Sequence, residues 1–599
     1  MDPISASTPP RRRFMRRLSW QLPLFGVTAM IAGFAPLGPT AVAKAATAQQ
    51  EGLVCAPGST APGGSTAVAP TVGTQPSFVL TAQDGYITTP DGNSVYMWGY
   101  SAGNNGFQYP GPVLCVYQGD KVTVTLRNTL PVDTSLQFPG ITTLSVDGSA
   151  LVPDLVDNSL SKIAPRNPLS QPNHGLLGGS VTYSFTAGRP GTFLYESGTD
   201  PQTQVQMGLA GALIVRPCNQ ATTPCTPEPA HVYDDMSNKA TTQHWSSTTV
   251  YQQGDRVRLV NAQGLSQVWQ AQTNIAAGGA APGTPGSLAM WDLGTDLADF
   301  SRFNPQHEYL HVLSEIDPAQ HQAYETSNSE PWNSSKASGY ALGADVTANG
   351  LMYQSTAAAN TSNPSTAGSS WAPMFDATKY NARYWFINGR SFPDTIAPNF
   401  SAHLPTQPYG ALVHIQPITP PSSSAYYSSL DVGNEWPALV RFLNTGPVDY
   451  PFHPHADHDR QVGIDASPQI NNLDQTDVST DHFGLVVAPG QTTEGLFSWY
   501  DAQHWSSGQN PIVVPIPDLQ SRAAGAYWSQ TPYLGDRQDP NTGVVQYNQC
   551  GELYHVAHSH ALFQATNFGA PGGGMLTMIR VDPPNSFPNH ANCSEPWNG

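Results

Sequence analysis

Residues 111–128 read GPVLCVYQGDKVTVTLRN, and this stretch decides the fold class of the chain. The dipeptide Gly119-Asp120 marks a turn, and polar and apolar residues alternate from Lys121 to Arg127. Alternation with a period of two is typical of a strand that buries one face. Similar runs follow at residues 180–185, 191–195 and 211–215. We therefore expect a β-sandwich of about 140 residues around this stretch.

The composition extends this interpretation to the whole chain. Gly (54) and Pro (55) are abundant among the 599 residues, and charged residues make up only 11%. Such a composition is typical of many short strands joined by turns rather than of helices. Further apolar runs lie at residues 309–313, 384–390, 411–414, 439–444 and 575–581. We expect an all-β chain with three sandwiches, over residues 76–230, 294–400 and 401–583.

The first 46 residues resemble an export signal. A basic run, Arg11-Arg12-Arg13-Phe14-Met15-Arg16, precedes an apolar stretch over 18–37, and Ala41-Val42-Ala43 offers a cleavage site. The basic run resembles a twin-arginine signal, and the general secretory route is the alternative. No other apolar stretch is long enough to span a bilayer. We expect an exported, extracellular or periplasmic protein, with a flexible leader over 47–75 and a C-terminal tail over 584–599.

Charge and cysteine content bound the partners and the compartment. The formal net charge is −18, which argues against nucleic acid and anionic membranes as partners. Six cysteines, an even number in a chain expected to be exported, indicate disulfides. Cys218 and Cys225 are close enough in sequence to pair with each other. The sequence leaves open how the remaining four pair: Cys55, Cys115, Cys550 and Cys593.

An internal repeat occupies residues 243–293 and 332–375, and its second copy interrupts the sandwich expected over 294–400. Each copy is too short for a large core yet dense in aromatic residues. Such residues either form a small core or stack on sugar rings through exposed faces, and we expect both roles. The recurring aromatic residues are Trp245, Tyr251, Trp269 and Trp291 in the first copy and Trp332, Tyr340, Tyr353 and Trp371 in the second.

Two His-x-His motifs lie in the third expected sandwich, His453-Pro454-His455 and His558-Ser559-His560. Because residues i and i+2 of a strand share a face, each motif offers two imidazoles on one side of one strand. If the two strands are neighbours, four nitrogen donors surround one site, and imidazole suits copper, zinc, iron or nickel. The alternative is that these histidines are hydrogen-bonded and hold no metal.

The layout and several motifs resemble the multicopper oxidase family of cupredoxin-fold proteins. The resemblance is carried by residues 111–120, 191–198, 206–215, 452–455 and 558–560. It implies three cupredoxin-like Greek-key sandwiches and copper as the cofactor. The two repeats resemble small carbohydrate-binding modules of chitinases and related enzymes, which implies a polysaccharide such as chitin or cellulose as a partner.

The chain departs from this family at the copper ligands. Members of the family hold a trinuclear copper cluster with four His-x-His motifs, and a blue copper with a cysteine thiolate. Here the first motif is replaced near residues 141–145, and the second aligns with Glu196-Ser197-Gly198. The blue-copper cysteine aligns with Ser559, one of its histidines aligns with Tyr450, and the other is missing near Gln564.

The retained residues therefore imply a reduced copper site of one or two ions. Its ligands would be His453, His455, His558 and His560, with Glu196 as a possible oxygen ligand. Further candidates are His458, His482 and His555.

Without the thiolate, we do not expect a laccase-type four-electron cycle, and we expect instead an exported copper-binding oxidoreductase acting at or near polysaccharide. The alternatives are a non-catalytic carbohydrate-binding protein and a copper-handling protein without turnover. No Ser–His–Asp or paired-carboxylate motif indicates a hydrolase.

Overall fold

The structure is a computed structural model, and it is built almost entirely from β-strands, which confirms the all-β class. It describes residues 52–56, 75–150, 160–167, 176–219, 226–227, 230–233, 243–253, 255–260, 266–284, 287, 289–294, 300–349, 351–415, 437–455, 459–470, 477–498, 513–514, 546–547, 553–571 and 573–581. The expected export signal and C-terminal tail lie outside these residues. In the described part of the chain, no helix has both the length and the apolar character needed to cross a membrane.

The first sandwich contains residues 111–128. A six-stranded sheet, in the order β2-β1-β4-β7-β5-β6, packs on a three-stranded sheet, in the order β3-β9-β8. The strands are β1 (Ser77–Thr88), β2 (Ser94–Ala102), β3 (Leu114–Tyr117), β4 (Lys121–Asn128), β5 (Ser145–Val146), β6 (Ser149–Ala150), β7 (Ser180–Thr186), β8 (Gly191–Glu196) and β9 (Ala210–Arg216). The alternation in β4 places Val122, Val124 and Leu126 in the core, as the sequence predicts.

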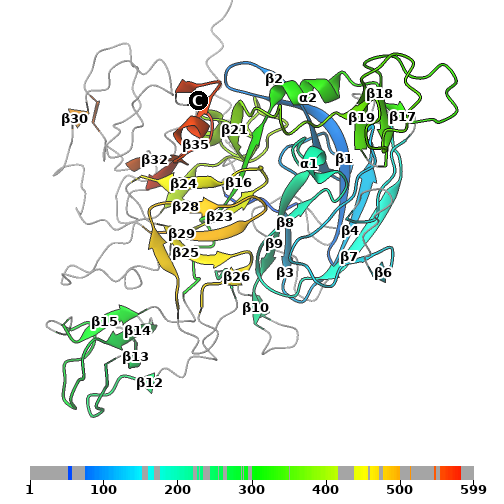
Figure 1. Cartoon of the computed structure of the whole chain (residues 1–599). Helices are drawn as coiled ribbons and strands as arrows, with labels where there is room; N and C mark the ends of the chain where they lie inside the picture. The colour runs from blue at the N-terminus through cyan, green and yellow to red at the C-terminus, as the bar shows by residue number, and fades with distance from the viewer. Residues whose placement is uncertain are drawn as a thin grey trace, which may run out of the picture. The chain divides into compact units, whose positions relative to one another are not determined.

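The second sandwich corrects the expected division into three. Strands β16 and β21, expected to belong to a sandwich of their own over 294–400, instead join the sheet β21-β16-β23-β29-β25-β26, with β27 paired to β25 (Figure 1). This sheet packs on β22-β35-β32-β24-β28. Two sandwiches therefore account for the large sheets among the described residues.

The bounds of these strands are β16 (Glu308–Ile316), β21 (Tyr384–Ile387), β22 (Val413–Ile415), β23 (Ala438–Asn444), β24 (Tyr450–Pro454), β25 (Asp459–Ile464), β26 (Ser467–Pro468), β27 (Thr480–His482), β28 (Leu485–Val487), β29 (Thr492–Phe497), β32 (Leu553–Ser559) and β35 (Leu576–Val581). Short elements complete the description: β10 (Cys218–Asn219), β11 (Thr226–Pro227), β30 (Val513–Val514), β31 (Gln546–Tyr547), β33 (Thr566–Asn567), β34 (Ala570–Pro571), helices α1 (Pro201–Gln204) and α2 (Pro318–Glu325), and 3-10 turns η1 (Asp394–Ile396) and η3 (Leu562–Ala565).

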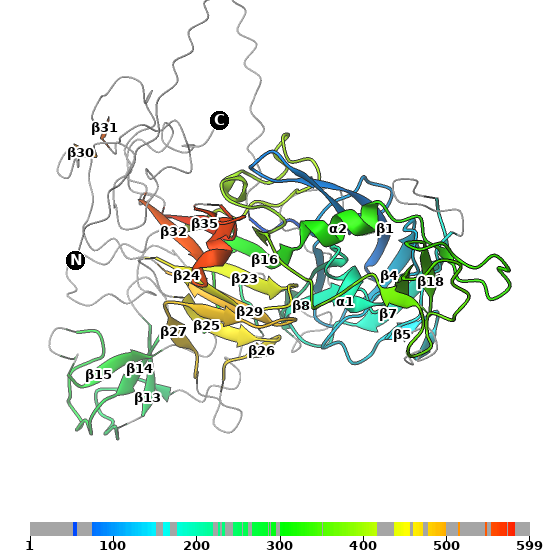
Figure 2. The same cartoon turned by 45° about the horizontal axis from the view of Figure 1, so that its top comes forward.

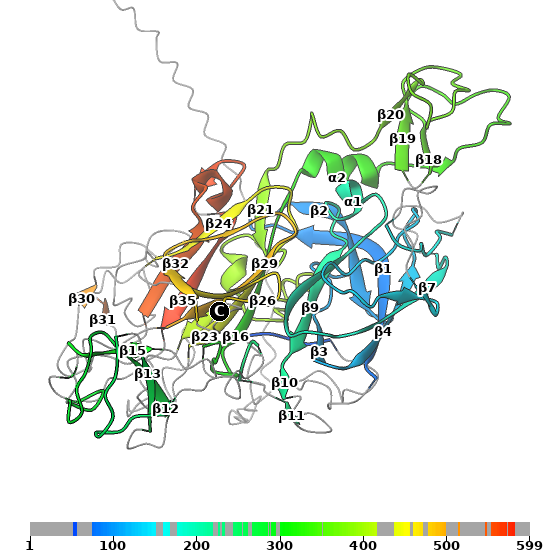
Figure 3. The same cartoon turned by 60° about the horizontal axis from the view of Figure 1, so that its bottom comes forward.

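The internal repeat forms two four-stranded sheets of the same topology (Figure 3). In each, the first two strands are parallel and the next two pairings are antiparallel. The strands are β12 (Gln243–His244), β13 (Arg256–Val260), β14 (Ser266–Ala271) and β15 (Trp291–Gly294), and β17 (Glu330–Pro331), β18 (Asp345–Ala348), β19 (Leu351–Ser355) and β20 (Trp371–Pro373). The core contact repeats too, with ring centroids 5.1 Å apart in Tyr251–Trp291 and 5.2 Å apart in Tyr340–Trp371.

The disulfides settle one pairing that the sequence left open. Cys55 is bonded to Cys115, and Cys218 is also disulfide-bonded. Cys225, Cys550 and Cys593 lie outside the described residues. The prediction of a flexible leader over 47–75 is therefore wrong for residues 52–56. Leu53 is buried and its N–H donates to the Glu308 carbonyl at 2.6 Å, because an apolar side chain and a disulfide tie this segment to the core.

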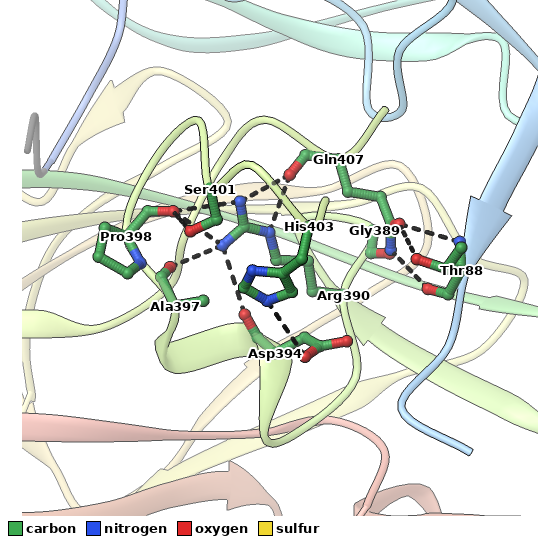
Figure 4. A network of polar contacts seen from close by, with 9 residues as sticks. All are labelled: Thr88, Gly389, Arg390, Asp394, Ala397, Pro398, Ser401, His403 and Gln407. Atoms are coloured by element: carbon green, nitrogen blue, oxygen red, sulfur yellow. Dashed lines mark hydrogen bonds and ion pairs between the residues drawn. The ribbon is translucent and has the colours of Figure 1, made fainter. Parts of the chain in front are cut away.

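The loop after β21 is organised by one buried guanidinium (Figure 4). Arg390 donates to the backbone carbonyls of Gln407 at 2.6 and 2.9 Å and of Ala397 at 2.6 Å. Gln407 then joins this loop to the first sandwich, since its Oε1 accepts from the Thr88 N–H and its Nε2 donates to the Thr88 carbonyl, both at 3.0 Å.

A buried network of charged side chains joins the two sandwiches. Glu308 of β16 accepts from Arg216 of β9 at 2.6 Å and from Arg441 of β23 at 2.8 Å. Arg441 also donates to the Thr192 hydroxyl of β8 at 3.1 Å, and Glu494 of β29 accepts from the Thr192 N–H at 2.8 Å. All four charged side chains are at most 3% exposed, and two positive and two negative charges balance.

We predict that Glu308→Gln strongly destabilises the protein. It keeps the volume but leaves two buried guanidinium groups with a single carboxylate between them, and breaking a buried ion pair costs about 3–5 kcal/mol. The free energy of unfolding by urea measures the effect. Lys162→Ala, which removes the exposed Lys162–Asp147 pair, is the control and should change it by less than about 1 kcal/mol. Equal effects of the two substitutions would contradict the role given to the buried network.

Two buried histidines predict how stability depends on pH. His311 donates from Nε2 to the Ala411 carbonyl at 3.0 Å, and His321 donates from Nδ1 to the Tyr96 carbonyl at 2.6 Å. Burial lowers the pKa of each to about 4, against an ordinary value of 6.5. Between these values the unfolded chain binds protons that the folded chain does not, so stability falls as the pH falls through this window.

We predict that the free energy of unfolding decreases with a slope of up to about 1.4 kcal/mol per pH unit for each of these histidines between about pH 6 and 4.5. His311→Gln and His321→Asn keep the donated hydrogen bond but cannot be protonated, so each should reduce the slope. Urea unfolding at a series of pH values measures it. A slope unaltered in both variants would show that other groups control the acid sensitivity.

Candidate metal centre

The two His-x-His motifs lie on neighbouring antiparallel strands, which is the condition under which the sequence places four imidazoles together. Strands β24 and β32 are neighbours (Figure 2), and their register places His453 directly opposite His558. The pairing continues beyond the strands, since the His455 N–H donates to the Val556 carbonyl at 2.9 Å and the His560 N–H to the Pro451 carbonyl at 2.7 Å. The alternation of side chains turns Tyr450 and Phe452 toward the core of the second sandwich and the histidines toward the opposite face.

The four imidazoles form one cluster. Ring centroids are 4.8 Å apart for His453–His455 and for His453–His560, and 5.0 Å apart for His455–His558. The shortest contact joins Nε2 of His455 to Nε2 of His558 at 2.9 Å. Two imidazole nitrogens bound side by side to one metal ion, each at about 2.0 Å, lie about 3 Å apart, so this pair fits adjacent metal ligands.

Backbone carbonyls orient two of the rings. The Nδ1–H of His558 donates to the carbonyl of Ser559 at 2.8 Å, and the Nδ1–H of His453 donates to the carbonyl of Phe483. Both assignments leave Nε2 with its lone pair, which is the arrangement that metal-binding histidines need. The sequence could not identify these two carbonyls, because Phe483 lies on a different loop and a carbonyl leaves no signature in the side-chain pattern.

Burial favours the neutral form of two of the imidazoles. Burial, followed by the charges of the neighbouring histidines, lowers the pKa of His455 to about 4. Burial is also the main cause that lowers the pKa of His558. Since a protonated imidazole cannot bind a metal, these lowered pKa values keep the His455 and His558 donors available at neutral pH.

The site needs a side-chain adjustment to offer a third ligand. In the part of the chain that the structure describes, no three His, Cys, Asp or Glu side chains already converge on one point. His453 is half-buried and His560 is exposed, so either ring can turn toward the His455–His558 pair.

The other predicted ligands lie elsewhere or outside the described residues. Glu196 lines a cavity that contains none of the four histidines, and its Oε1 accepts from Gln137 Nε2 at 2.7 Å. His482 lies on β27, where its Nε2 contacts the Thr480 hydroxyl at 2.7 Å. His555 is buried two residues from Ala557, on the core side of β32. His458 lies outside the residues described.

The positions aligned with the blue-copper ligands form a buried polar contact instead. The hydroxyl of Ser559 donates to Oε1 of Gln564 at 2.5 Å, and both residues are buried, as is Tyr450. A hydroxyl engaged in this way cannot replace a thiolate as the soft ligand of a blue copper.

Most aromatic residues predicted to bind sugars are core residues. Tyr251, Trp269 and Trp291 are buried in the first small sheet and Tyr340, Tyr353 and Trp371 in the second, because modules of this size need these rings for their cores. Trp245 and Trp332, which occupy equivalent positions, are only partly buried.

The first sandwich is similar in sequence to known proteins. Residues 82–220 match the family model described as multicopper oxidase. The chain is 33% identical over 122 residues to the multicopper oxidase CTB12 of Cercospora beticola, and 32% identical over 142 residues to the multicopper oxidase VdtB of Byssochlamys spectabilis. These segments cover 20% and 24% of this chain, and only 16% and 17% of the relatives.

Solved structures are similar over a larger share of the chain. A blue copper oxidase from Nitrosomonas europaea is 14% identical, with 84% of this chain and 85% of that chain covered and a TM-score of 0.38. A copper nitrite reductase from the same organism is 13% identical, with 86% and 95% covered and a TM-score of 0.37. Sequence similarity over residues 82–220 relates the chain to the multicopper oxidase family.

Proposed function

We propose that this protein is a copper-binding oxidoreductase whose site is the four-histidine cluster on the second sandwich. The observation that carries the proposal is the 2.9 Å contact between Nε2 of His455 and Nε2 of His558, beside two further imidazoles. Relationship to the multicopper oxidases favours copper among the metals that imidazole binds. Export and action at or near polysaccharide are parts of the same proposal.

The residues of the cluster hold the protons and orient the donors. His558 keeps its proton on Nδ1, against the Ser559 carbonyl, so the 2.9 Å contact requires His455 to carry a proton on Nε2. Metal binding must move that proton from Nε2 of His455 to Nδ1 or to solvent. A copper ion held by imidazoles alone can change oxidation state by one electron, whereas Ser559 offers no thiolate for a blue site.

We predict that the intact protein, loaded with Cu²⁺ and then desalted, retains copper at a stoichiometric level and gives a type 2 electron paramagnetic resonance spectrum without intense blue absorption. The variant His455→Gln/His558→Gln should lose this copper, because it lacks the two facing nitrogens. Elemental analysis measures the retained metal. His482→Gln, at a half-buried histidine outside the cluster, is the matched control and should retain the copper.

Failure of the wild-type protein to retain copper, or equal retention by the double variant, would refute the proposed site. Oxygen consumption with a reductant then separates the two copper-dependent alternatives. Oxygen consumption that depends on His455 and His558 supports an oxidoreductase. Copper binding without oxygen consumption supports a copper-handling protein.

A specific observation favours polysaccharide as a partner. Two modules of the same topology each leave one tryptophan, Trp245 or Trp332, partly exposed at the same position. An indole face can stack on the apolar face of a sugar ring, and two such modules on one chain increase the avidity for a polymer.

We predict that Trp245→Ala/Trp332→Ala reduces the fraction of protein pulled down on chitin or cellulose by about tenfold, since losing both contacts removes the stacking and the avidity. Phe483→Ala, which removes another aromatic side chain, 70% exposed, is the control and should bind as the wild type does. Pull-down that is equal for all three proteins would argue that the modules have no role in polymer binding.

A further inference from the structure

A cavity of about 470 Å³ lies apart from the histidine cluster. The first sandwich contributes Glu196 and the segment around α1, and β16 of the second sandwich contributes Ser314 and Glu315. The segment after β20 contributes Phe375, Ala377 and Tyr380, and the turn after β23 closes the remaining side. The walls are therefore partly aromatic and carry two carboxyl groups.

The two carboxyl groups have no positively charged partner in the cavity, whose lining contains no Lys, Arg or His. Glu315 is 6% exposed and accepts from Trp385 Nε1 at 2.9 Å and from the Tyr380 hydroxyl at 3.2 Å, which are neutral donors. Glu196 accepts at Oε1 from the neutral amide of Gln137. Burial raises the pKa of both groups, that of Glu196 to about 7, as expected for carboxyl groups without a counter-charge.

A buried hydroxyl also lies beside this cavity. Tyr450 is fully buried, and its hydroxyl interacts with the carboxyl group of Glu315. It lies directly against Gly446, which lines the cavity, at a place where any side-chain carbon would collide with it. Tyr450 is therefore a further neutral group beside Glu315, and it supplies no counter-charge to the cavity.

We propose that this cavity binds a small organic cation, an ammonium group on an apolar body, with the ammonium against the carboxylate of Glu196. Glu315 supplies the second negative charge of the wall, and the rings of Phe375 and Tyr380 contact the apolar body. A cation provides the missing counter-charge and donates hydrogen bonds to carboxylates, and aromatic faces favour cations as well. The volume suits a ligand of about ten non-hydrogen atoms.

The proposal is tested with benzylamine as the probe, by calorimetric titration of the full chain at about pH 8, where Glu196 is ionised and the amine is protonated. Saturable binding is expected, with neutral benzyl alcohol and anionic benzoate weaker by about tenfold or more. Glu196→Gln should weaken benzylamine binding by about tenfold, because it removes the charge while keeping the shape. The matched control is Asp481→Asn, an exposed carboxyl on β27, and should not change the affinity.

A second variant tests the cavity without altering its charges. Ala377→Trp places a large side chain at the exposed edge of the cavity and should block benzylamine while the thermal unfolding temperature is retained. Absence of saturable benzylamine binding, equal affinity for benzyl alcohol, or full affinity in a folded Glu196→Gln protein would each overturn the proposal. The outcome is independent of copper binding, since none of the four histidines lines the cavity.

Discussion

The position of Glu308 between Arg216 and Arg441 is the constraint on which the rest of the structure depends. Two strands of the second sandwich, β16 and β23, and one strand of the first, β9, meet at this carboxylate. A buried charge without a partner is strongly destabilising. The two sandwiches must therefore pack so that each charge of this network keeps its partner. Thr192 and Glu494 extend it, and Leu53, Ile214 and Leu310 provide an apolar contact beside it.

This packing also explains why strands expected in a separate sandwich lie within the second one. Strand β16 carries Glu308 and pairs in parallel with β23, which carries Arg441. Glu308 lies opposite Leu439 in this pairing. Arg441 is two residues further along β23, so its guanidinium is close to the Glu308 carboxylate. The cavity that contains Glu196 and Glu315 forms where the same two sandwiches meet, and its ligand preference is thus a consequence of the docking.

The histidine cluster depends on a different pairing, that of β24 with β32. One face of β24 gives Tyr450 and Phe452 to the core, and the other gives His453 to the histidine cluster, with His455 directly after the strand. Ser559 of β32 is buried and hydrogen-bonded to Gln564. The core contacts and the imidazoles therefore lie on opposite faces of the same pair of strands.

The sequence alone determined the all-β class, the strand at 121–127, the repeat of two modules, and the two imidazoles that each His-x-His motif places on one face of its strand. These features follow from local periodicity, since a period of two fixes which side chains share a face whatever the strand pairs with. Only the tertiary structure decided that β16 pairs with β23, that Glu196 faces a cavity instead of the histidines, and that most of the repeated aromatic rings are buried. Periodicity carries no information about which distant strand supplies the neighbouring hydrogen bonds, and Glu308 and Arg441 are 133 residues apart. That choice is made by burial and charge pairing summed over the whole chain.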